Sequence, residues 1–225
     1  MSESRPPAGS GQSASDHRRL VVAPLAVLVA TLLVVWTASV YVLRNIEGLD
    51  PSLRQLVPFV LWSGTILIWV RWQRIRDPLR YLGLGRPAGR ALALSFAAFA
   101  IVIAWHLIRV SLARQPGGIL GELPWYIYVW LLVGVFLNEA LLRGLVQQRL
   151  TEAFDPAVAI AVTAILGVAF RIPAFFTTTV PMPIDPLVLF GVLIFGLIAG
   201  LLRHFTRSLW PALGLQWANS LGQLL

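Results

Sequence analysis

The sequence contains no cysteine and no lysine, and only 12% of its 225 residues are charged. The lack of cysteine excludes disulfides, thiolate zinc sites and cysteine nucleophiles. A soluble domain of this size would carry about 25% charged residues. Instead, 57% of the residues are hydrophobic, and the mean hydropathy of +0.76 indicates a membrane protein. The arginines are scattered between apolar segments, so the net charge of +8 does not favour a nucleic-acid partner.

The apolar runs predict an all-α, polytopic transmembrane helical bundle of about seven spans, forming one domain over residues 20–225. Residues 1–19 are rich in Ser, Gly and Pro and are predicted to form a disordered cytoplasmic tail. Whether the last segment crosses the bilayer fully is left open. The predicted spans are 20–43, 55–72, 91–112, 123–147, 156–175, 186–203 and 208–225.

The arginines predict the orientation of the bundle in a cell membrane. With a cytoplasmic N-terminus, thirteen of the eighteen basic residues fall on or near the inner side and five on the outer side. The positive-inside rule favours this arrangement. The basic loop 71–90 is interpreted as a topogenic segment resting on anionic lipid headgroups, with docking of a partner as the alternative. Its glycines do not fit the dinucleotide-binding pattern, and no cofactor is predicted.

A polar stripe interrupts the fourth predicted span. Glu139, Arg143 and Gln147 recur every four residues and share a helix face, with Asn138 near its edge. A charge inside a membrane is costly unless it is paired, so Arg143 is the predicted partner of Glu139.

The last predicted span carries a second polar face, and the sixth carries two closely spaced glycines. Helical spacing places Gln216, Asn219, Ser220 and Gln223 on one side, which we expect to face the bundle interior. If the fourth and the last predicted spans run in opposite directions, this face lies at the same depth in the membrane as Glu139. The two polar surfaces are therefore predicted to form a buried polar cluster. Gly196 and Gly200 form a small-xxx-small motif, predicted to serve helix packing.

Two segments together resemble a known family. NEALLRGLVQQRL, residues 138–150, resembles the E-E-x-x-x-R motif of the CPBP family, the CAAX-processing and bacteriocin-processing (abortive-infection type) intramembrane proteases. The ending GLIAGLLRHFTRSLWPALGLQWANSLG resembles that family's third-motif region, where an S-L-W turn leads to H-x-x-x-N. The resemblance covers about residues 80–225. It implies an intramembrane endopeptidase fold whose members act on prenylated C-terminal peptides and other membrane-associated peptides.

The sequence departs from the family at nearly every position to which the resemblance assigns proton transfer. In the family, the first Glu and a His of the second motif activate water, while His and Asn of the third motif stabilise developing charge. Glu139 and Arg143 match the second Glu and the Arg of the first motif. The substituted positions are Asn138 for the first Glu, Phe170 for the second-motif His, Gln216 for the third-motif His and Ser220 for its Asn.

These substitutions predict a catalytically silent homologue that keeps a polar cavity for binding or scaffolding. Its predicted partners are the lipid bilayer and a membrane helix, a lipidated peptide or a partner membrane protein. One alternative is an active CAAX-type protease with a rearranged site using Glu139. A second alternative is a small transporter or channel. A third is that the Glu139–Arg143 pair only stabilises the fold and binds no ligand.

The histidines offer no obvious replacement for the missing groups. His204 is predicted to lie at the surface, and His106 to be a satisfied histidine of the bundle or an interface. Neither has the spacing to a second ligand that a metal site requires, so no metal is predicted.

Overall fold

The computed structural model describes residues 10–225 except 47, 49–50, 86–88, 114–122 and 177–184, and all regular secondary structure in this part of the chain is helical. The predicted all-α class is confirmed. The elements are α1 (Ser10–Arg44), α2 (Pro51–Trp72), α3 (Pro78–Tyr81), α4 (Gly89–Ala113), α5 (Trp125–Glu139), the π-helix η1 (Ala140–Val146), α6 (Gln147–Thr151), α7 (Pro156–Arg171), the 3₁₀-helix η2 (Ile172–Phe176), α8 (Pro186–Thr206) and α9 (Trp210–Gly222).

Every apolar run in the sequence forms a helix, and four helical segments are long and apolar enough to cross a membrane. These four are Arg19–Leu43, Gly89–Leu112, Trp125–Thr151 and Pro186–Thr206. The apolar stretches Phe59–Trp72 and Pro156–Arg171 are shorter. The protein is therefore a multi-pass membrane protein, and the count of about seven crossings stays a prediction.

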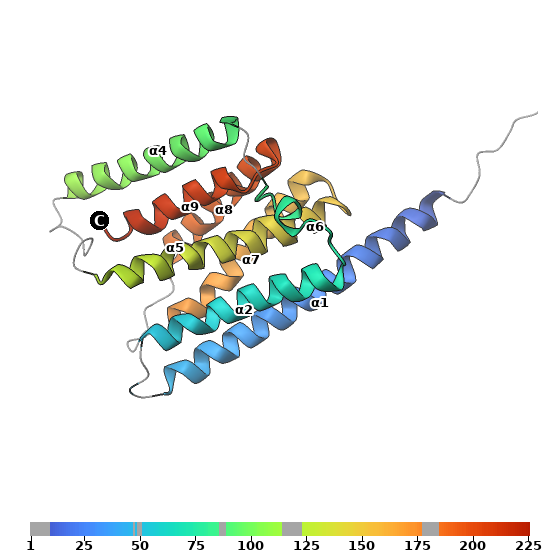
Figure 1. Cartoon of the computed structure of the whole chain (residues 1–225), viewed down its shortest axis with the longest axis horizontal. Coiled ribbons are helices and arrows are strands. Elements are labelled where there is room, and N and C mark those ends of the chain that lie inside the picture. The colour runs from blue at the N-terminus through green and yellow to red at the C-terminus, as the bar shows by residue number, and fades with distance from the viewer. Residues whose placement is uncertain (1–9, 47, 49–50, 86–88, 114–122, 177–184) are drawn as a thin grey trace, which may run out of the picture.

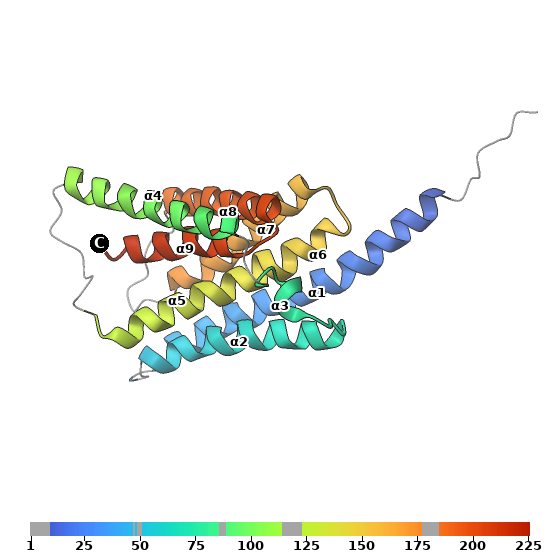
Figure 2. The same cartoon turned by 45° about the horizontal axis from the view of Figure 1, so that its top comes forward.

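The beginning of the chain differs from the sequence prediction. Helix α1 starts at Ser10, so residues 10–19 are helical rather than disordered, while residues 1–9 lie outside the described residues. Extending a helix that already exists avoids the cost of nucleation, which explains how polar residues join the apolar span. In both views the first turns of α1 project beyond the other helices (Figures 1 and 2).

The bundle has two sides joined by α5 and its continuation. Helices α1 and α2 lie side by side, while α4 runs along α9, with α7 and α8 behind them (Figure 1). Ser95 Oγ on α4 donates to the Trp210 carbonyl at the start of α9, at 2.8 Å. Trp217 Nε1 on α9 donates to the Leu132 carbonyl of α5, at 2.9 Å. These bonds fix α9 between α4 and α5, where it reaches the centre of the bundle.

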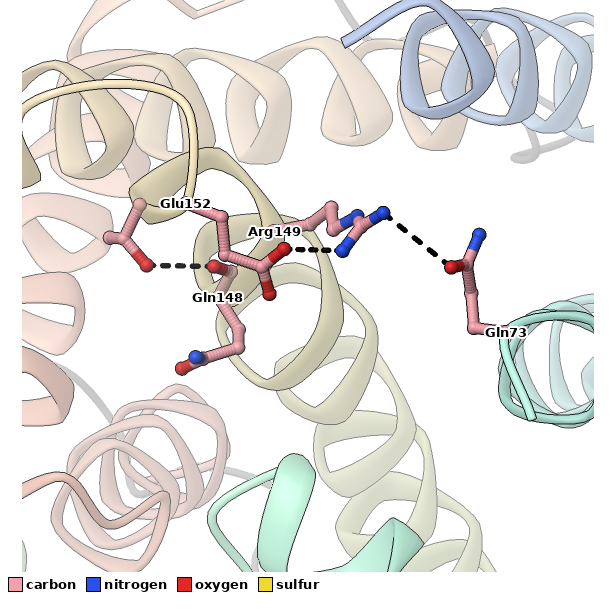
Figure 3. A network of polar contacts seen from close by, with 5 residues as sticks. Gln73, Gln148, Arg149 and Glu152 are labelled. Carbon is pink, nitrogen blue, oxygen red and sulfur yellow. Dashed lines mark hydrogen bonds and ion pairs between the residues drawn. The ribbon is translucent and has the colours of Figure 1, made fainter. Parts of the chain in front are cut away.

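One end of the bundle, which we call the arginine-rich end, gathers the ends of α2, α6 and α8 and the starts of α4, α7 and α9. The predicted basic loop folds onto it, because Asp77 caps α3 and the Gly83 carbonyl accepts from Leu209 N at 2.9 Å. Arg149 pairs with Glu152 and also reaches Gln73 Oε1, at 3.5 Å (Figure 3). The loop is thus a packed part of the fold.

The close approach of α4 and α9 depends on Gly214. A Cβ there would lie 2.5 Å from the backbone oxygen and the hydroxyl of Ser95. We expect Gly214→Ala to push the helices apart and to lower the free energy of unfolding by about 1–3 kcal/mol. Unfolding in mixed detergent micelles measures this effect. Gly64→Ala is the control, since a Cβ at Gly64 in α2 meets nothing within 4 Å; an equal loss in both variants would contradict the explanation.

Candidate functional site

Glu139 and Arg143 form a buried ion pair at the centre of the bundle. Arg143 Nη1 donates to Glu139 Oε1 at 3.0 Å, and the two side chains are only 3% and 1% exposed. The pairing predicted from their four-residue spacing is confirmed. Removing a charge from water costs several kcal/mol, and mutual attraction offsets that cost only at close range. Each member therefore depends on the other.

The pair lies where α5 passes into a π-helix. Glu139 is the last residue of α5, Arg143 lies in η1, and Gln147 begins α6. The sequence analysis assumed a regular α-helix through this region, and that detail is wrong. Residues four apart remain neighbours in the wider π turn, so the polar stripe survives the change of geometry. Such turns occur frequently at functional sites.

Glycines on α8 make room for this polar stripe. A Cβ at Gly196 would lie 2.9 Å from Arg143 Nη2, and one at Gly200 would lie 3.2 Å from Gln147 Oε1. Gln147 Nε2 also donates to the Gly200 carbonyl at 3.0 Å. The same glycines contact α7, at Ala164 and Ile160. The predicted packing role is confirmed, and accommodation of Arg143 and Gln147 is added to it.

A central cavity of about 1100 Å³ opens beside the ion pair. The polar face of α9 predicted from helical spacing lines it with all four of its members, Gln216, Asn219, Ser220 and Gln223. Sequence positions from three motifs far apart in the chain therefore meet at one cavity. All six candidate site residues line it: Asn138, Glu139, Arg143, Phe170, Gln216 and Ser220.

Phe170 belongs to an aromatic wall of the cavity. Its ring packs edge-on against Trp62, with centroids 5.3 Å apart, and Trp62 in turn packs against Trp36 at 5.5 Å. Trp36 Nε1 donates to the backbone carbonyl of Phe170 at 3.2 Å. The position that the resemblance assigns to a catalytic histidine is thus built into an apolar surface.

His106 from α4 also lines the central cavity, which the sequence analysis did not foresee. The residue is 5% exposed, and its Nε2 lies 3.4 Å from Asn219 Oδ1. Gly222 leaves space for the imidazole, since a Cβ there would clash with the ring. The predicted position inside the bundle agrees with this contact, but the histidine is only half satisfied, because its buried Nδ1 has no hydrogen-bond partner among the described residues. Arg109, three residues further along α4, lines the same cavity and is the sequence signal for this face.

His204 does not line the central cavity, and the described residues form no metal site. His204 is exposed at the end of α8, as predicted. Among the described residues, no three His, Cys, Asp or Glu side chains come together in a way that would hold a metal ion. The chemistry available at the central cavity is that of a carboxylate paired with a guanidinium, two further guanidinium groups, amides, hydroxyls and one imidazole.

The segment that carries the motifs of this cavity matches a known protein family. Residues 119–222 match the family model described as type II CAAX prenyl endopeptidase Rce1-like. Over this segment the chain is similar to the Rce1-like family. It is an integral membrane homologue of CAAX proteases, as the resemblance to the CPBP family predicted. The search of curated proteins and the search of solved structures returned no match.

The six candidate positions all fall inside the segment that matches the Rce1-like family, whereas His106 falls outside it. The imidazole at the cavity therefore comes from a part of the chain to which the family model assigns nothing. Its position opposite α9 follows from the packing of α4 rather than from a family motif.

The buried ion pair is expected to stabilise the fold far more than an exposed one. Glu139→Gln leaves Arg143 buried without a counter-charge, and we expect a loss of about 3–5 kcal/mol in the free energy of unfolding. Glu152→Gln is the matched control, because the Arg149–Glu152 side chains are 22% and 32% exposed and such a pair contributes about 1 kcal/mol or less. Equal losses in detergent-micelle unfolding would refute this difference.

Proposed function

We propose that this homologue does not hydrolyse peptides and that its central cavity binds a membrane-embedded or lipidated peptide. The observation that carries the proposal is the composition of the cavity. It is large, yet Asn138 and Phe170 stand at the positions that activate water in the family, and Gln216 stands at one that stabilises developing charge. A general acid or base contributes about 10²–10⁴-fold in rate, so losing two such groups removes most of the family's chemistry.

Glu139 does not readily replace the missing base. Its Oε1 accepts from Arg143, and the residue is 1% exposed. Its Oε2 has no hydrogen-bond partner among the described residues, but a proton taken from water would neutralise the carboxylate and leave Arg143 as a buried cation without a counter-charge. The pair is better suited to orienting α5 and α8 around a bound ligand.

The lining of the central cavity suits a peptide with an apolar portion. Trp36, Trp62 and Phe170 supply an aromatic wall, while Gln216, Asn219 and Ser220 face it with amides and a hydroxyl. Ligand sites of this kind combine an apolar lining with a few polar groups that fix orientation.

One observation favours a second candidate, an active protease with a rearranged site. His106 places an imidazole at the same cavity as Glu139. A histidine titrates near neutral pH and is the commonest general base. In this alternative His106 activates water and Glu139 acts beside it.

Peptide cleavage separates the two candidates. We expect the purified protein in lipid nanodiscs to leave farnesylated and transmembrane peptides intact. Mass spectrometry of the peptides after prolonged incubation measures the outcome. Cleavage that is lost in His106→Gln would establish the protease instead, and cleavage that survives this change but is lost in Glu139→Gln would establish a site built on the carboxylate alone.

Filling the central cavity should abolish ligand binding. Gly191 lines the cavity, and a Cβ there meets nothing within 4 Å, so Gly191→Phe is expected to project into the open space without disturbing the packing. We expect affinity for a fluorescent farnesylated peptide to fall at least tenfold, which corresponds to about 1.4 kcal/mol. Gly64→Phe is the control, because Gly64 has equal space and does not line the cavity. Equal affinity in both variants would place the binding site elsewhere.

We infer that the arginine-rich end of the bundle faces the cytoplasm of a cell with the N-terminus on that side. The support is the excess of arginines there, which the positive-inside rule associates with the cytoplasmic face. A reporter fused to the N-terminus and active only in the cytoplasm tests this orientation.

A further inference from the structure

A second cavity of about 770 Å³ opens at the arginine-rich end, among α3, α6 and the end of α8. Its lining is strongly basic, and no carboxylate among the described residues contributes to it. Neither the family assignment nor the proposed peptide site explains this composition. We call it the basic cavity. Its guanidinium groups beyond the central ion pair are those of Arg80, Arg203 and Arg207, and His204 also lines it.

Arg203 is a buried cation in this cavity without a carboxylate partner among the described residues. It is 7% exposed, and its Nη2 donates to the neutral Gln148 Oε1 at 3.3 Å. Its Nε has no hydrogen-bond partner in the described part of the chain. A buried charge is costly unless an opposite charge compensates it. The side chain is therefore poised to pair with an anion that enters the basic cavity.

The backbone around Gly83 is shaped to hold this guanidinium. A Cβ at Gly83 would lie 2.7 Å from Arg203 Cζ. Gly83 also has a φ of +79°, which residues with a side chain rarely adopt. The Gly83 carbonyl is bound by Leu209 N, so the turn is fixed against the start of α9. Arg203 thus rests on a rigid surface.

Arg207 adds a second charge at some cost to the backbone. It ends α8 with a φ of 52°, in the left-handed region where glycine is the usual residue. The dipole of α8 explains why a cation is favourable at this end of the helix. It does not explain why the position holds arginine, since glycine would adopt the left-handed backbone without strain. Because the dipole contributes only about half a negative charge, the basic cavity remains attractive to an anion.

Neutral donors complete the basic cavity. Gln148 and Thr151 of α6 line it, as does Tyr81 of α3. Burial, reinforced by the nearby Glu152 charge, raises the pKa of the Tyr81 phenol, so at neutral pH its hydroxyl keeps its proton. In Figure 3 the Gln148 side chain points away from the Arg149–Glu152 pair. The ion pair of Arg149 with Glu152 therefore does not involve the Gln148 side chain, which accepts the hydrogen bond from Arg203.

We propose that the basic cavity binds a phosphate group, either free or as the headgroup of a phospholipid. Several guanidinium groups with hydroxyl and amide donors match the many acceptor oxygens of phosphate better than the two of a carboxylate. The cavity exceeds the size of a phosphate ion, which leaves room for a headgroup. Phe205 lines it and is 75% exposed, which offers an apolar exit toward acyl chains.

The test compares two arginines that share the same unusual backbone. Arg74 has a φ of 50° and is exposed, but it does not line the basic cavity. Both Arg207→Gly and Arg74→Gly remove one positive charge and place glycine where the backbone favours it, so both variants are expected to fold. The full-length variants are purified in maltoside micelles, which contain no phosphate, and binding is measured by titration calorimetry.

Two probes distinguish the sources of phosphate. Inorganic phosphate tests a free ion, and dihexanoyl phosphatidic acid tests a headgroup with acyl chains. We expect the unsubstituted protein to bind at least one of them, Arg207→Gly to weaken that binding about tenfold or more, and Arg74→Gly to change it less than twofold. Binding of phosphate alone or of both probes identifies a site for the ion, and binding of the lipid alone identifies a headgroup site.

Absence of binding by the unsubstituted protein would overturn the proposal. Equal weakening by Arg207→Gly and Arg74→Gly would also overturn it, because the effect would then be general electrostatic attraction to the arginine-rich end. Neither result bears on peptide binding at the central cavity, which Gly191 tests separately.

Discussion

The buried pair of Glu139 and Arg143 is the constraint to which the rest of the bundle is fitted. Two charges removed from water are tolerated only at close range and with good geometry. The surroundings meet that condition from several elements. Gly196 leaves space 2.9 Å from Arg143 Nη2, and Gly144 lets the turn at Leu82 approach the π-helix. The pair therefore has an architectural role whether or not chemistry takes place beside it.

The substitutions around the central cavity are consistent with one another. The backbone carbonyl of Phe170 accepts a hydrogen bond from Trp36 Nε1, so this position makes a polar contact through its backbone alone. Its ring packs on Trp62, a contact that an imidazole would partly lose. On the opposite side Gln216 and Ser220 keep donors and acceptors but do not titrate near neutral pH. His106 and Arg109 of α4 add an imidazole and a guanidinium to the same lining. At the family positions themselves the side chains are apolar on one side and neutral and polar on the other, which agrees with the proposed binding role.

Much of the fold and of the central cavity is predictable because helical periodicity and the cost of buried charge are local rules. They gave the helices, the Glu139–Arg143 pair and the inward face of α9. The π-helix was missed, since its backbone geometry depends on packing against the turn at Leu82. His106 at the cavity was missed because the pairing of α4 with α9 is a tertiary contact. Arg203 counted only among the thirteen inner-side basic residues, although its spacing from Gly196 and Gly200 already put it on their inward face.

The two cavities are distinct but share Arg143 as part of their walls. Arg143, which lines both cavities, and Arg203, which lines the basic cavity, each rest against a glycine, Gly196 and Gly83 respectively. A flexible cationic side chain held against backbone loses little further entropy when a ligand arrives, which favours binding by preorganisation. Arg143 already has its anion within the chain, while Arg203 has only a neutral amide. An arginine packed against a glycine thus forms an ion pair in the centre of the bundle, whereas at its end it remains available to bind an anion.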